Sequence, residues 1–159
     1  MILYLLRHAE AEVNRSDDTS RHLTKRGYEQ AQLVSKFMLE RGLRPKLFLT
    51  SPVVRARETA EIVVSKLGMS TANLIELPWL SCGMEANTAI KELASYKSFD
   101  SIMIVGHEPD FSSLIATLLG LFNSTSFHVS KASLSAIELP HISAHAGVLQ
   151  FMIPASLLL

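Results

Sequence analysis

Four side chains that can handle a phosphoryl group stand just after short apolar segments of the chain: Arg7, His8, Arg55 and His107. An uncharged imidazole can attack phosphorus and carry the phosphoryl group covalently, which divides one difficult displacement into two easier ones. The planar guanidinium group of arginine donates two parallel hydrogen bonds, so it suits phosphate better than an ammonium group does. These residue types indicate a phosphate-sized anion pocket that contains histidine chemistry.

The segments around these residues alternate between predicted strands and predicted helices. Apolar runs predict strands at 2–6, 47–50, 74–77, 101–105, 133–139 and 148–153. Helical periodicity and capping residues predict helices at 25–41, 52–67, 86–96 and 111–119. We therefore expect an α/β fold with a mainly parallel sheet that is covered by helices on both faces. Ligands bind beyond the carboxyl ends of such strands, which is where the four side chains stand.

The pair Ser51-Pro52 predicts the start of the second helix, with the serine as N-cap and the proline at the first helical position. Arg55 would then lie near the first helical turn, where free N–H groups and the helix dipole also favour an anion. Each motif has an ordinary explanation as well, since a histidine beside an arginine is common on surfaces and the segment around His107 can be a simple turn. Their convergence at one edge of the sheet favours an active site.

Composition limits the classes of protein that remain. The chain has 159 residues, and its 15 Lys and Arg balance its 15 Asp and Glu, which suits one domain spanning residues 1–159 and argues against a nucleic-acid partner. The single cysteine, Cys82, excludes an internal disulfide and a cysteine-based zinc site. The apolar stretches are shorter than the roughly 20 residues that span a bilayer, so we expect no membrane partner and a cytoplasmic location.

Four motifs together resemble the histidine phosphatase superfamily, which has a phosphoglycerate mutase-like fold. They are Leu6-Arg7-His8-Ala9-Glu10, Leu23-Thr24-x-x-Gly27-x-x-Gln30-Ala31, Ser51-Pro52-x-x-Arg55-Ala56-x-x-Thr59 and Val105-Gly106-His107. They occur in the order and spacing of the family and extend from residue 2 to about residue 120. The small size and the segment Asp17-x-x-x-Arg21-x-Leu23-Thr24 look most like the bacterial SixA-type phosphohistidine phosphatases.

This resemblance implies a three-layer α/β sandwich and a phosphatase that uses no metal and no cofactor. It implies that His8 is the nucleophile and that Arg7, Arg55 and His107 form the phosphate pocket. The implied substrate is phosphohistidine on a signalling protein, such as a phosphotransfer domain. Two further substrate contacts are expected from the segment after the first motif: Asn14 and Arg21.

The sequence departs from the family pattern in ways that bear on mechanism. Ala9 stands where the family has glycine. Mutases and phosphomonoesterases of the family protonate an alkoxide leaving group with a carboxylic acid, and the candidates here, Glu10 and Glu85, do not match the mutase pattern. A phosphoimidazole needs no such acid, because it can be protonated on its free ring nitrogen and leave as neutral imidazole.

Three functions are therefore compared. The favoured one is a phosphatase of phosphohistidine on a protein. The second is a phosphatase of small phosphomonoesters that uses Glu10 or Glu85 as the general acid. The third is a non-catalytic module that binds a phosphorylated ligand on the same fold, although the intact Arg7-His8 pair and His107 argue against it.

Overall fold

Six strands form one sheet in the computed structural model, which describes residues 1–14 and 16–158. In chain order the strands are β1 (Ile2–Arg7), β2 (Leu47–Thr50), β3 (Leu74–Glu76), β4 (Ser101–Gly106), β5 (Leu134–Glu138) and β6 (Val148–Ile153). Their order across the sheet is β3-β2-β4-β1-β5-β6. The four strands from β3 to β1 are parallel, whereas β5 runs antiparallel to both of its neighbours. The predicted mainly parallel sheet is confirmed.

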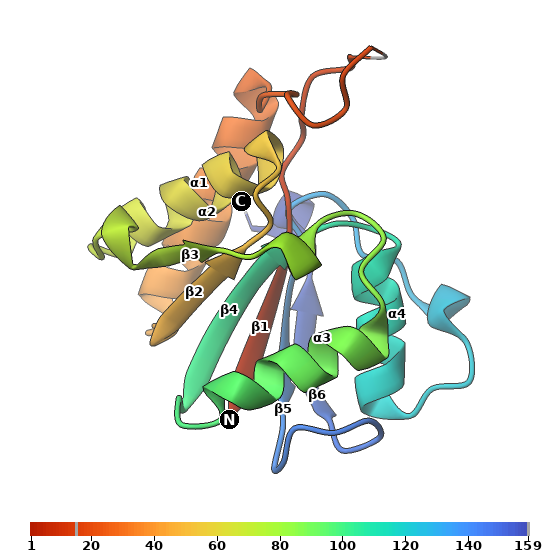
Figure 1. Ribbon diagram of the computed structural model, residues 1–159. Helices are drawn as coiled ribbons and strands as arrows, with labels where there is room; N and C mark the ends of the chain where they lie inside the picture. Colours follow the sequence, from red (N-terminus) through yellow and green to blue (C-terminus); the bar gives the residue numbers. More distant parts are fainter. Residues whose placement is uncertain (15, 159) are drawn as a thin grey trace.

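Helices cover both faces of this sheet and give the predicted three layers (Figure 1). Helices α1 (Lys25–Glu40) and α2 (Val54–Lys66) lie together on one face, and α3 (Ala86–Leu93) and α4 (Asp110–Leu119) lie on the other. Short 3-10 turns occupy Thr71–Asn73, Pro78–Leu80, Ala94–Tyr96, Ser124–Ser126 and Ala155–Leu157. The segment between β1 and α1 rises above the carboxyl ends of the parallel strands, where the motif residues were expected (Figure 1).

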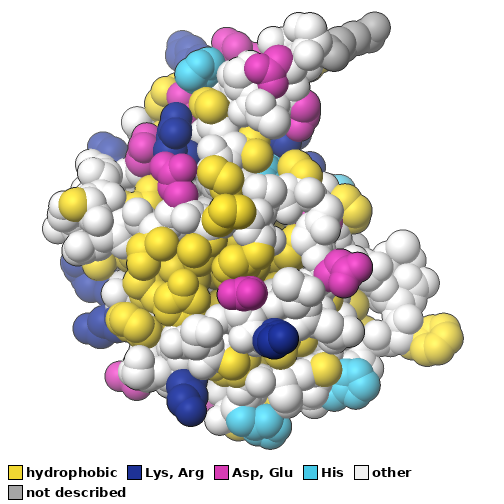
Figure 2. Space-filling view, viewed as in Figure 1, with side chains coloured by type: hydrophobic (Ala, Val, Ile, Leu, Met, Phe, Trp, Pro, Cys, Tyr) yellow, Lys and Arg dark blue, Asp and Glu magenta, His cyan; other side chains and the backbone are white. Residues whose placement is uncertain are grey.

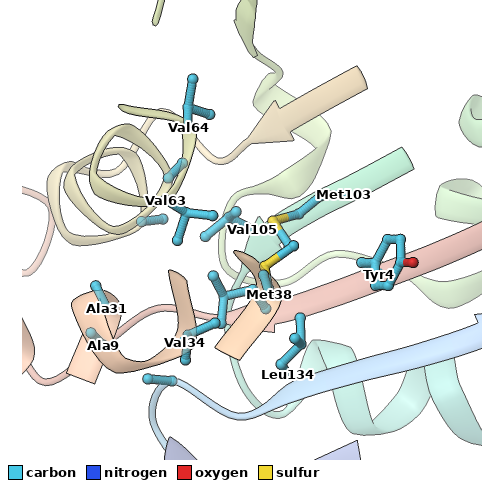
Figure 3. Close-up of a cluster of buried hydrophobic side chains, with 14 of the residues drawn as sticks. Tyr4, Ala9, Ala31, Val34, Met38, Val63, Val64, Met103, Val105 and Leu134 are labelled. Carbon is cyan, nitrogen blue, oxygen red and sulfur yellow. The ribbon is translucent and has the colours of Figure 1, made fainter. Parts of the chain in front are cut away.

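Each face of the sheet has its own hydrophobic core. On the face of α1 and α2, Met38 and Val34 from α1 and Val63 from α2 pack against Met103 and Val105 of β4 (Figure 3). The first four residues after Ile2 in β1 are buried, because β1 is a central strand covered on both faces. Ala9 also belongs to this core and is completely buried, so the alanine that replaces the family's glycine contributes to packing directly below the site.

The second helix begins later than the sequence predicted. Its N-cap is Val53, not Ser51, and Pro52 precedes the helix. The Ser51 hydroxyl accepts a hydrogen bond from the Val53 N–H, as a cap does, but it also lies at hydrogen-bond distance from His107. The prediction that Ser51 is the N-cap was wrong, because Ser51 lies at the edge of the sheet, where its hydroxyl contacts His107, and the helix begins after Val53.

The outer surface differs from one part of the molecule to another. Hydrophobic side chains are visible between β3 and α3, where Ile75 is exposed, and charged side chains gather around the segment between β1 and α1 (Figure 2). Among the described residues, no helix is both long enough and apolar enough to cross a membrane.

Candidate active site

A cavity of about 410 Å³ opens at the carboxyl ends of β1, β2 and β4. Its lining includes all four residues of the predicted phosphate pocket and one of the two further contacts, namely Arg7, His8, Arg55, His107 and Arg21. Residues that lie as much as 100 positions apart in the chain meet here because β4 lies between β1 and β2, with Arg7 paired to Gly106 and Thr50 paired to Val105. The topology thus delivers three strand ends to one place.

His8 is held as an uncharged imidazole with one nitrogen directed at a cation. Its Nδ1 lies 2.8 Å from the carbonyl oxygen of Ala9 and can only donate to it, so the proton resides on Nδ1. Nε2 then accepts a hydrogen bond of 3.2 Å from Nε of Arg55. Burial lowers the pKa of His8 from 6.5 to about 3, so the ring is neutral at physiological pH. A neutral ring with its proton on Nδ1 and its lone pair on Nε2 is the protonation state that a nucleophile requires, and in the unliganded protein this lone pair accepts from Arg55.

His107 lies beside His8, with the two ring centroids 5.2 Å apart. Burial, and then the positive charge of Arg55, lower the pKa of His107 from 6.5 to about 4. The ring is therefore uncharged at pH 7 in the unliganded protein. Its Nε2 shares a hydrogen bond of 2.9 Å with the Ser51 hydroxyl, while its buried Nδ1 makes no hydrogen bond within the part of the chain that the structure describes.

Arg7 is anchored from one side only. One of its terminal nitrogens donates to the carbonyl oxygen of Val129 at 2.8 Å, and its buried Nε makes no hydrogen bond to any described residue. Burial lowers the pKa of Arg7, which the carboxylate of Glu108 partly counteracts, but an arginine stays charged at any physiological pH. The cavity thus holds fixed positive charge with hydrogen-bond donors still available, which is the environment that a phosphoryl group needs.

Asp18 joins the two arginines at the mouth of the cavity. Its carboxylate accepts from Arg55 at 3.0 Å and from Arg21 at 2.9 Å, and its carbonyl oxygen accepts from Arg55 at 2.6 Å. Burial raises the pKa of the Asp18 carboxyl group, but the hydrogen bond and the positive charge of Arg55 outweigh burial and lower this pKa. The carboxyl group is therefore ionised at neutral pH. The guanidinium of Arg55 therefore spans from the nucleophile to a carboxylate.

The first and third motifs are tied together by Thr59. Its hydroxyl accepts a hydrogen bond from the N–H of Ala9 at 3.0 Å and donates one to the carbonyl oxygen of Arg55 at 2.7 Å. Ala9 directly follows His8, and Arg55 itself lines the cavity, so both hydrogen bonds are made to the backbone at the pocket. The threonine of the third motif thus fixes the backbone after His8 relative to helix α2.

The second motif supports the backbone at Glu10. The Gln30 side chain accepts from the N–H of Glu10 at 2.9 Å, and the Thr24 hydroxyl donates to the Glu10 carboxylate at 2.8 Å while it caps α1. Gly27 lies against the same backbone so closely that a Cβ there would be 2.0 Å from the carbonyl oxygen of Glu10. The motif therefore has a structural role, because it holds the segment that follows the nucleophile.

Three residues predicted for the site are not brought to the cavity. The Glu10 carboxylate is turned to Thr24, as just described, and the exposed Glu85 is the N-cap residue of α3. The side chain of Asn14 accepts hydrogen bonds from the backbone and hydroxyl of Ser16 and from the N–H of Asp17, so it stabilises an exposed turn. The structure therefore does not bring these two candidate acids and this substrate contact to the cavity: the side chains of Glu10 and Asn14 are hydrogen-bonded elsewhere, and Glu85 is exposed and makes no side-chain cap hydrogen bond.

Sequence reasoning missed several residues that line the cavity: Asp18, Cys82, Glu108 and Lys131. Glu108 follows His107 directly, so its position immediately after the fourth motif was a usable signal. Asp18 lies inside the segment Asp17-x-x-x-Arg21, which resembles the family. The aspartate quoted from that segment, Asp17, accepts hydrogen bonds from Thr19 and does not line the cavity, whereas Asp18 does. Cys82 lies 3.6 Å from Arg55, and burial raises the pKa of its thiol. Nothing in the sequence pattern indicates Lys131, because it approaches from the distant segment before β5.

Comparisons with known proteins agree with this geometry. The family model of the histidine phosphatase superfamily (branch 1) matches residues 3–81. A phosphohistidine phosphatase SixA homolog of Haemophilus influenzae is 33% identical over 138 residues, which cover 80% of this chain and 83% of that protein. The mitochondrial serine/threonine-protein phosphatase Pgam5 of Drosophila grimshawi is 37% identical over 82 residues, 51% of this chain but only 28% of that protein.

A solved structure supports the same fold. The protein histidine phosphatase SixA complexed with tungstate superposes with a TM-score of 0.86, with 98% of each chain covered and 20% sequence identity. The predicted phosphoglycerate mutase-like sandwich is thereby confirmed. From its motifs, its cavity and the relative that it matches over most of both lengths, the chain is a phosphatase that belongs to the histidine phosphatase superfamily, with a SixA-like fold.

Proposed function

We propose that this phosphatase hydrolyses phosphohistidine on a signalling protein, through a phosphohistidine intermediate on His8 and without a metal. One observation carries the choice of substrate: neither carboxylate that lines the cavity among the described residues is placed to donate a proton. Asp18 is ion-paired with two arginines, and both oxygens of Glu108 accept hydrogen bonds from Ser112. An alkoxide leaving group needs a proton donor, whereas a protonated phosphoimidazole does not.

The reaction then has two balanced steps. The Nε2 lone pair of His8 forms a bond to phosphorus, and the bond from phosphorus to the substrate nitrogen breaks. The electron pair of that bond returns to the substrate ring, which already carries a proton on its other nitrogen and leaves as neutral imidazole. Water then forms a bond to the phosphorus of the phosphoenzyme, the bond from phosphorus to Nε2 breaks with its electron pair returning to His8, and inorganic phosphate leaves with the protons of the water.

Charged side chains supply the electrostatic stabilisation in this proposal. Four cationic side chains line the cavity: Arg7, Arg21, Arg55 and Lys131. Stabilising the equatorial phosphoryl oxygens is the main task in phosphoryl transfer, and guanidinium groups can do it without a metal. The name of the Haemophilus relative, a phosphohistidine phosphatase homolog, supports the same substrate class.

The test is phosphate release from a histidine-phosphorylated phosphotransfer domain, with EDTA present, for the wild-type protein and for His8→Ala. We expect release by the wild type, none by the variant, and little turnover of a phosphoserine peptide, whose alkoxide leaving group needs a proton donor. Acid-labile radioactive phosphate that stays on wild-type protein, but not on His8→Ala, identifies the phosphoenzyme. Release that persists in His8→Ala contradicts the nucleophile assignment, and activity that requires an added metal contradicts the metal-independent mechanism.

A phosphomonoester substrate is the second candidate, and it would require Glu108 to give up its contacts with Ser112 and act as the general acid. This carboxylate lines the cavity, and the Pgam5 relative is named as a serine/threonine-protein phosphatase. If Glu108 were the general acid, Glu108→Gln would abolish turnover of phosphoserine peptides and leave phosphohistidine hydrolysis unchanged. Poor phosphoserine turnover by the wild type would instead exclude this candidate.

A further inference from the structure

The cavity contains an ionised carboxylate that the proposed reaction does not yet use. Asp18 lines the cavity, and 60% of its side chain is exposed at the mouth. Arg55 and Arg21 each hold one of its oxygens, at 3.0 Å and 2.9 Å, so the carboxylate is fixed from two sides. A carboxylate has about four lone-pair sites, and these two ion pairs leave others free to accept a hydrogen bond.

Its position relative to His8 indicates which part of the substrate it meets. Arg55 donates to His8 through Nε and to Asp18 through its terminal nitrogens, so the guanidinium lies between nucleophile and carboxylate. In an in-line displacement the leaving group departs on the side of phosphorus opposite the nucleophile. With phosphoryl oxygens bound to Arg55, the leaving ring extends away from His8, toward the mouth where Asp18 lies.

We infer that Asp18 is the residue that selects phosphohistidine, by accepting a hydrogen bond from the protonated free ring nitrogen of the substrate. The inference rests on the proposed function and names how that substrate is recognised. A carboxylate that accepts this hydrogen bond favours the cationic ring, so a larger share of the bound substrate carries the proton that makes imidazole a neutral leaving group. A phosphoester has no such nitrogen and gains nothing from the carboxylate.

The other lining carboxylate is less suited to this role. The Oε1 of Glu108 accepts from the N–H of Ser112, and its Oε2 accepts from the Ser112 hydroxyl, so it is committed to the start of helix α4. The charged and titratable groups that face Asp18 are otherwise its two arginine partners and, around the same cavity, Arg7, His8, Cys82, His107 and Lys131. Both histidines are already neutral above pH 5, so they do not produce a pH effect near neutrality.

The decisive measurement is the single-turnover rate, with saturating enzyme, of phosphate transfer from a phosphohistidine peptide between pH 5.5 and 9. This rate reports on the bound complex, so it falls at high pH as the bound ring loses its proton. In Asp18→Asn we expect the fall to occur about one pH unit lower, which leaves the rate near wild type at pH 6 and about 10-fold lower at pH 8. Asp18→Glu should restore part of the wild-type profile.

Two controls separate this role from a structural one. Asp17→Asn changes the adjacent carboxylate, which bonds to Thr19 outside the cavity, and should keep the wild-type profile. With p-nitrophenyl phosphate, Asp18→Asn should show no such shift. An unchanged profile in Asp18→Asn, or an equal loss on both substrates at every pH, overturns the role of Asp18 alone. A wild-type protein that leaves the phosphohistidine peptide intact overturns the proposed function, and this inference with it.

Discussion

Ser51 and His107 share a hydrogen bond of 2.9 Å although they lie 56 positions apart and both are almost completely buried. They follow neighbouring strands, β2 and β4, and the N–H of Ser51 donates to the carbonyl oxygen of Val105 at 3.0 Å. The serine hydroxyl therefore sets the orientation of an imidazole that would otherwise have both ring nitrogens without a partner among the described residues. A positioned ring is what phosphoryl transfer requires of His107.

Ser51→Ala should lower kcat/KM on a phosphohistidine peptide by about 10-fold, because loss of one buried hydrogen bond costs roughly 1–2 kcal/mol in the orientation of His107. The change also leaves the Val53 N–H and the buried Nε2 of His107 without a partner, so the thermal unfolding midpoint should fall by a few degrees. Steady-state kinetics and a thermal melt check the two expectations. Ser65→Ala, on the exposed side of α2, serves as the control and should behave like the wild type.

Arg55→Lys should lower kcat/KM by roughly 100-fold, because the single nitrogen of an ammonium group cannot reach the separate positions that the three guanidinium nitrogens occupy between His8 and Asp18. Inhibition by tungstate, a phosphate analogue, should weaken in parallel, because we expect the same donors to bind it. Arg57→Lys is the matched control: Arg57 pairs on the surface with Glu61 at 3.7 Å and Glu76 at 3.9 Å. Equal kinetics for the two variants would show that catalysis does not depend on the guanidinium group of Arg55.

The strands and the pocket cations could be predicted because their signals are local. Continuous apolar runs identify the buried central strands, and the ends of parallel strands meet at one edge whatever the helices do. Helical spacing alone also predicts a surface pair between Arg57 and Glu61, which stand four positions apart, and the structure contains this pair at 3.7 Å.

Contacts made by the loops could not be predicted in the same way. Asp18 reaches Arg55 across 37 positions, and the direction of its side chain depends on the path of the segment between β1 and α1. The path of this segment also decides where the Glu10 side chain lies. Its carboxylate accepts a hydrogen bond from Thr24 at the start of α1, which the sequence pattern did not indicate. A sequence pattern shows which residue types approach the sheet edge, but tertiary hydrogen bonds decide which of them face the cavity.

Gly27→Ala should destabilise the fold and the site together. The new Cβ would lie 2.0 Å from the carbonyl oxygen of Glu10, and a backbone atom cannot move aside as a flexible side chain can. We expect the free energy of unfolding to fall by about 2–3 kcal/mol, as overpacking typically costs, although alanine favours a helix more than glycine does. Urea denaturation measures the change. Glu29→Ala, at an exposed position of the same helix, should shift it by less than about 0.5 kcal/mol.

The two buried histidines should make the fold sensitive to mild acid. Burial lowers the pKa of His8 to about 3 and that of His107 to about 4, whereas both titrate near 6.5 when the chain is unfolded. Between these values the unfolded chain binds more protons than the native one, so stability is full above pH 6.5 and declines as the pH falls toward 4. At pH 5 each histidine should cost about 2 kcal/mol relative to pH 7.

Urea denaturation of the wild type at pH 7 and pH 5, beside His8→Gln, tests this linkage. The variant has lost one of the two titrating groups, so its unfolding free energy should fall by about 2 kcal/mol less than that of the wild type over the same interval. His141→Gln, which changes an exposed histidine, should keep the full wild-type decline. If His8→Gln and the wild type lose equal stability, His8 is protonated in the native protein at pH 5, and it then lacks the free Nε2 lone pair that attack on phosphorus requires.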